Sequence, residues 1–154
     1  SGAKWDDLVL SFLNASEVAV RYKDADVGTF DYEALEFSKR VSSENGIPGG
    51  VLWELLYKIA IFSVYEGRGD AHPTKQTLLQ SFAGVKENAL EKRRSNLATR
   101  LQSAFGITDD PFLPYDQKEG YCLKFTLKLP PALRGDGEVH RSGISYIDEL
   151  NSDD

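Results

Sequence analysis

The chain has 154 residues, of which 41% are hydrophobic and 27% are charged, which is the balance of an ordinary globular domain. No stretch approaches the roughly 18 uninterrupted apolar residues that span a bilayer, and the start lacks a signal-peptide layout, so we expect neither a membrane protein nor a secreted one. The single cysteine, Cys122, excludes an internal disulfide and is typical of a reducing compartment, so we expect a cytoplasmic protein. The Ser-Gly-Ala start and the lack of methionine indicate a fragment of a longer protein.

The net charge of −6 argues by itself against a nucleic-acid partner, but the charge is unevenly distributed. Residues 1–85 carry −4, residues 86–141 carry +2, and residues 142–154 carry −4. The positive block is therefore where a DNA contact is expected.

The first segment, 1–16, is predicted to be an amphipathic helix. Its apolar residues fall at positions i, i+3, i+4, i+7 and i+8, which places them on one side of a helix: Trp5, Leu8, Val9, Phe12 and Leu13. Such a helix normally packs on its own domain. Self-association and a link to a neighbouring domain are the alternatives.

Two strands and a loop are predicted next. Residues 17–23 alternate apolar and polar side chains, which indicates a strand, and the polar run 24–28 is typical of a turn. Residues 29–37 are expected to form a second strand, although their far end fits a helix equally well. Residues 42–50 are polar and glycine-rich, which predicts a loop.

Residues 51–65 are the most hydrophobic part of the chain and are predicted to form a central helix covered on most sides. Two further helices, joined by a tight turn, are predicted after it. Thr74 is a plausible N-cap for the first and Gly84 its terminator, and the second spans 88–105 before Gly106.

The last regular element is predicted to be a β-hairpin over 112–129. Apolar residues from Tyr121 to Leu129 alternate strictly with polar ones, and Pro130-Pro131 then ends any ladder. Helix, turn, helix and hairpin is the order of a winged helix-turn-helix, so the expected fold class is α+β. The expected organisation is an N-terminal helix at 1–16, the winged domain at 17–130 and a partly disordered acidic tail at 131–154.

The helix at 88–105 is the predicted recognition helix. On a helical wheel its leucines lie on one side and its polar residues on the other, and residues 86–105 hold five basic and two acidic side chains. Amide and lysine side chains suit base edges in the major groove, and arginines suit phosphates. The predicted DNA-contacting residues are those of this face together with one wing-tip lysine: Asn88, Lys92, Arg93, Ser95, Asn96, Thr99, Arg100 and Lys118.

The run from Lys92 to Leu101, followed after a short spacer by Glu119-Gly120-Tyr121-Cys122-Leu123, resembles the effector domain of the OmpR/PhoB response regulators. In that family a recognition helix precedes a hairpin whose second strand opens with Gly-Tyr-x-Leu, and strands precede the first helix. The resemblance implies a bacterial transcription regulator that binds double-stranded DNA. The segments 1–14 and 130–154 have no counterpart there.

Nothing in the sequence predicts an enzyme or a cofactor. His72 and His140 lie far apart with no neighbouring ligand set, and Gly67-Arg68-Gly69-Asp70 lacks the spacing and the lysine of a phosphate loop. We expect no metal, no small-molecule ligand and no membrane partner. The alternatives to DNA binding are a winged helix that contacts another protein, a homodimer among them, and a structural linker domain.

Overall fold

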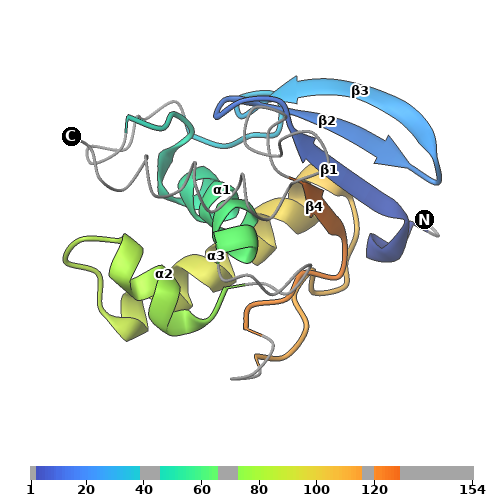
Figure 1. Ribbon diagram of the computed structural model, residues 1–154. Coiled ribbons are helices and arrows are strands. Elements are labelled where there is room, and N and C mark those ends of the chain that lie inside the picture. The colour runs from blue at the N-terminus through green and yellow to red at the C-terminus, as the bar shows by residue number, and fades with distance from the viewer. Residues whose placement is uncertain (1–2, 39–45, 66–72, 116–119, 129–154) are drawn as a thin grey trace.

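The computed structural model describes residues 3–38, 46–65, 73–115 and 120–128 (Figure 1). It confirms the α+β class. The elements in chain order are the 3-10 turn η1 (Trp5–Asp7), β1 (Leu8–Phe12), β2 (Glu17–Tyr22), β3 (Ala25–Asp31), α1 (Gly50–Tyr65), α2 (Lys75–Ser81), α3 (Glu87–Phe105) and β4 (Thr126–Lys128).

The N-terminal helix predicted at 1–16 is wrong, because this segment forms η1 and then β1. The apolar residues fit a helical stripe, but Leu8, Leu10 and Phe12 also alternate with a period of two, and all three are almost completely buried. Leu13, which the helical stripe would bury, is 38% exposed.

The strand predicted at 17–23 is confirmed as β2, but the next strand begins earlier than expected. The reversal takes place at Lys23 and Asp24, which both have positive φ angles, and β3 therefore starts at Ala25 within the segment predicted to be a turn. It stops at Asp31, whose carboxylate accepts the backbone N–H of Ala34 at 2.8 Å and turns the chain away from the sheet.

The sheet joins the two ends of the described chain. Its strand order is β3-β2-β1-β4, with β1–β2 and β2–β3 antiparallel and β1–β4 parallel. Figure 1 shows β4, from the C-terminal part, beside β1 from the N-terminus. The parallel pairing matches Val9 with Thr126 and Leu10 with Leu127.

The predicted wing at 112–129 is not present as a regular hairpin within the described residues. Residues 111–113 and 122–124 are joined by one isolated antiparallel bridge, Phe112 with Leu123, and by two backbone hydrogen bonds of 2.8 and 2.7 Å. The alternation of apolar and polar residues that predicted a strand does correspond to an alternation of buried and less buried side chains. It arises because Tyr121, Leu123 and Phe125 pack into the core, whereas the described strand that follows them, β4, pairs with β1.

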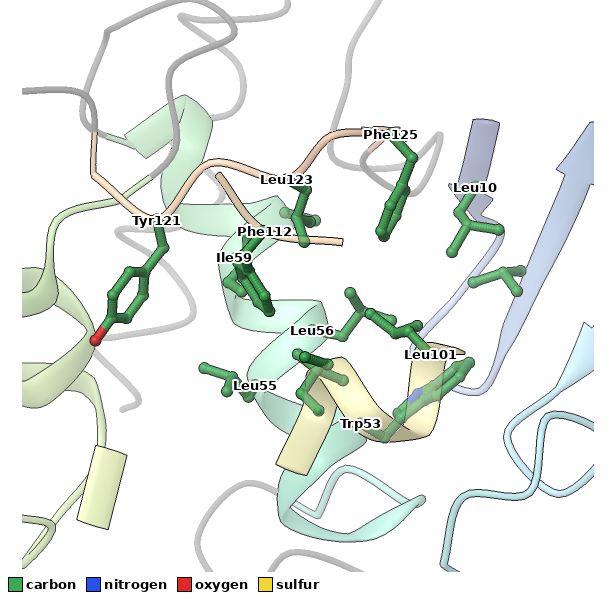
Figure 2. Close-up of a cluster of buried hydrophobic side chains, with 14 of the residues drawn as sticks. Leu10, Trp53, Leu55, Leu56, Ile59, Leu101, Phe112, Tyr121, Leu123 and Phe125 are labelled. Atoms are coloured by element: carbon green, nitrogen blue, oxygen red, sulfur yellow. The ribbon is translucent and has the colours of Figure 1, made fainter. Parts of the chain in front are cut away.

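The helix predicted at 51–65 is confirmed as α1, which lies at the centre of the molecule with α3 crossing it (Figure 1). Its Trp53 is completely buried, and the indole N–H donates to the Ala15 carbonyl at 2.7 Å. Figure 2 shows side chains of α1 between those of β1, α3 and the segment 112–125. One core therefore unites the sheet and the helices.

Several predictions lie outside the described residues: the 131–154 tail, the wing tip at 116–119 with Lys118, and both histidines. Within the described ranges, none of the helices has the length and apolar character needed to cross a membrane.

Candidate nucleic-acid interface

The two helices that would contact DNA begin and end where local sequence directs. Thr74 caps α2, since its side chain accepts the N–H of Thr77, and the turn to α3 contains Gly84 with φ +74°. Gly106, with φ +66°, ends α3 in the left-handed region that favours glycine. The two helices predicted on either side of this turn are thereby confirmed as α2 and α3.

One side of α3 is anchored in the core. Leu90, Leu97 and Leu101 are fully buried, and Ala98 is 8% exposed. This side packs against α1, so the opposite side is left for solvent. The amphipathic pattern of the sequence therefore predicts the orientation of α3 correctly.

The outward side of α3 carries most of the predicted contact residues. Five of them are exposed: Asn88, Lys92, Ser95, Asn96 and Thr99. The hydroxyl of Thr99 donates to the Ser95 carbonyl one turn earlier at 3.3 Å. Lys92 forms no ion pair with any described residue. This face therefore presents one free lysine and short polar side chains, without an outward carboxylate between residues 92 and 103.

The two flanking arginines differ from one another. Arg93 is half-buried, with its guanidinium 5.0 Å from the ring centre of Phe82, and it has no carboxylate partner among the described residues. The stacking restricts the side chain while leaving the cation available. Arg100 lies 3.8 Å from Glu36, at the far end of the turn after β3, so part of its charge is neutralised.

A cluster at the base of the helix pair, the Lys75 cluster, consists of Lys75, Glu87, Glu91 and Tyr121. The ammonium of Lys75 lies 3.0 Å from Glu87 and 2.5 Å from Glu91, and the hydroxyl of Tyr121 donates to Glu91 at 3.4 Å. Hydrogen bonds to Glu91 and Glu87 raise the pKa of Lys75 above its ordinary value. Burial, followed by the Glu91 charge, raises the pKa of Tyr121. The cluster joins α2, α3 and the segment after residue 119.

Arg94 strengthens the same junction. Its guanidinium lies 4.7 Å from the ring centre of Phe112 and 5.9 Å from that of Tyr121, and its Nε is buried without a hydrogen-bond partner. Figure 2 shows the Tyr121 hydroxyl directed away from the apolar cluster, toward the helix pair. The Arg94 side chain therefore lies on the side of α3 that faces Phe112 and Tyr121, and not on the outward side of this helix.

Chemically, this arrangement can donate hydrogen bonds and offer positive charge to an anionic surface. Among the described residues, no group of three histidine, cysteine or acidic side chains could hold a metal ion. Sequence reasoning missed the Lys75 cluster, the Phe82 stacking and the Glu36 contact. All three join residues from different elements, and no local spacing predicts them.

No family model matches this chain, and comparison with curated proteins and with solved structures finds no match either.

Proposed function

We propose that this chain is a DNA-binding domain of a transcription regulator, with α3 in the major groove of double-stranded DNA. The single observation that carries the proposal is the outward face of α3, where exposed Asn88, Lys92, Ser95, Asn96 and Thr99 share one side of a rigidly packed helix. Asparagine can bond adenine through two atoms, and lysine can reach the acceptors of guanine.

Charge supports the same assignment. Lys86, Lys92 and Arg93 lie on or beside the helix N-terminal half, and none has a carboxylate partner among the described residues. The two acids of this half, Glu87 and Glu91, are both paired with Lys75, so they oppose a phosphate less than free carboxylates would. Contacts of this kind position a protein on the DNA backbone.

The test is the salt dependence of binding to mixed-sequence duplex DNA, measured by fluorescence anisotropy. Each phosphate neutralised makes log affinity fall with log salt by about 0.9. We expect Lys92→Gln and Arg93→Gln each to remove one phosphate contact and so to lower the magnitude of this slope by about 0.9.

Lys23→Gln is the matched control, because Lys23 is an exposed lysine in the β2–β3 turn and its loss changes net charge equally. A slope that falls equally in all three variants would indicate an effect of net charge alone, and an unchanged slope in Lys92→Gln and Arg93→Gln would exclude this face as the DNA contact.

A second candidate is contact of the α2–α3 helix pair with another protein in place of DNA. It is favoured by the Arg100–Glu36 contact, which neutralises part of the charge of one predicted phosphate-contacting arginine. In that case Asn96→Arg, which adds positive charge to the face, would leave DNA affinity unchanged; for a DNA-binding face it should raise affinity for mixed-sequence DNA.

A further inference from the structure

The outer edge of the sheet has unusual exposure. Strand β3 is terminal in the strand order, and residues 25–29 are all exposed, although they belong to a regular strand. In β1 and β2, by contrast, alternate residues are buried. Figure 1 shows β3 along the rim of the sheet, with β2 between it and β1. Residues 25–29 of β3 are therefore open to solvent along the free edge of the sheet, although their partner Val20 in β2 is buried.

The free edge lacks two common protections against strand addition. Ala25–Asp31 contains neither lysine nor proline, the residues that most often prevent pairing at an edge. One irregularity is present, since Val20 pairs with Gly28 and Arg21 with Asp26, which leaves Val27 as an extra residue. Val27 is 55% exposed, more than any other large apolar side chain in the described part. Beyond the bulge, Gly28 to Asp31 pair regularly with β2.

The edge is negatively charged. Asp24, Asp26 and Asp31 belong to or adjoin β3, and the neighbouring cations are Arg21 and Lys23. Arg21 lies 3.8 Å from Asp26, but their side chains are 50% and 85% exposed, so water screens this pair strongly. A strand that pairs with this edge therefore meets more negative than positive charge.

We propose that the free edge of β3 binds an extended basic segment of a partner protein as an additional strand. Because β3 is the outer strand of the described sheet, the backbone groups along its free edge have no strand partner there, and an added strand would satisfy them. Basic side chains of that segment would lie near Asp26 and Asp31, and an apolar one would cover Val27. A second copy of this chain is a poorer occupant, because it would place the same aspartates against one another.

The probe is a nine-residue amidated peptide that alternates lysine with valine, titrated into the whole chain and followed by calorimetry and by NMR of the backbone amides. We expect binding, with shifts and slowed amide exchange confined to residues 25–31. Two control peptides test the mode: one with glutamate in place of lysine, and one with alternate amides N-methylated to remove donors. Neither should bind.

The protein variant is Val27→Lys, which places a charge at the edge, and its matched control is Val51→Lys at the 44% exposed Val51 of α1. Like charges on paired strands repel, so the affinity for the lysine peptide should fall by about fivefold in Val27→Lys and stay unchanged in Val51→Lys. Lys92→Gln should leave the affinity for this peptide unchanged, so failure of this proposal and failure of DNA binding are distinguishable.

Three results would overturn the proposal. They are equal binding of the N-methylated peptide, shifts that lie outside β3, and peptide affinity that is unchanged in Val27→Lys. Self-association of the free chain that is lost in Val27→Lys would also overturn it, because the edge would then bind a second copy.

Discussion

Helices α1 and α3 are similar in length, at 16 and 19 residues, but they have opposite relations to solvent. In α1 the side chains of Trp53, Leu55, Leu56 and Ile59 are at most 1% exposed, and even the charged Glu54 and Lys58 are buried. In α3 one side is buried and the other is free. A helix covered on most sides commits its residues to packing, whereas a one-sided helix leaves a rigid surface for a partner. The predictions below test this division.

The largest loss of stability is expected from Trp53→Ala. The substitution removes a fully buried indole, its edge contacts with Phe12 and Phe37, and the hydrogen bond to the Ala15 carbonyl. We expect the free energy of unfolding to fall by about 3–5 kcal/mol, measured by urea denaturation. A loss below about 1 kcal/mol would contradict a central role for α1.

Lys58→Met tests the buried polar part of α1. The ammonium of Lys58 lies 3.3 Å from Glu54, contacts the Ser81 carbonyl and lies 3.8 Å from the ring centre of Phe82. Methionine keeps the packing but removes the cation that faces a buried carboxylate, so we expect a loss of about 3 kcal/mol. Lys4→Met, at an exposed lysine, is the control and should change stability by less than about 0.5 kcal/mol.

Tyr121→Phe tests the Lys75 cluster. Loss of the hydroxyl that bonds Glu91 should cost about 1 kcal/mol at pH 7. The pKa values of Tyr121 and Lys75 are raised on folding, so above pH 10 the folded chain holds more protons than the unfolded one and stability falls as pH rises. Urea denaturation at several pH values should show a shallower alkaline fall in Tyr121→Phe than in the original chain. Equal slopes would exclude a contribution from Tyr121.

The smallest effect is expected from Asn96→Ala on the outward side of α3. Asn96 is exposed, while its neighbour Leu97 is fully buried. We expect the free energy of unfolding to change by less than about 0.5 kcal/mol, against about 2–5 kcal/mol for Leu97→Ala. Thermal denaturation of the two variants side by side provides the measurement. A large loss in Asn96→Ala would mean that this face is used for packing.

Local sequence was sufficient for the helices. The cap at Thr74, the glycines at 84 and 106 and the leucine spacing of α3 each act within a few residues, so the predicted bounds of α2 and α3 agree closely with the structure. The outward residues of the candidate site follow from the same spacing.

Long-range pairing was not predictable in the same way. The apolar residues from Trp5 to Leu13 fit a helix and a strand equally, and the strand was selected by pairing with β2 and with the distant β4. Tyr121, Leu123 and Phe125 alternate because they pack into the core, which local alternation alone does not distinguish from a wing. The partial neutralisation of Arg100 was not predictable for the same reason, because its partner Glu36 lies far away in the sequence, in the turn after β3.

The parallel pairing of β1 with β4 also has a consequence for synthesis on the ribosome. Strands β1, β2 and β3 emerge early, but β4 is translated only after α1, α2 and α3. Until then the nascent β1 has an open hydrogen-bonding side, which is a state prone to aggregation and to chaperone capture. Closure of such a distant contact is slow, so completion of the sheet should be a late event in folding.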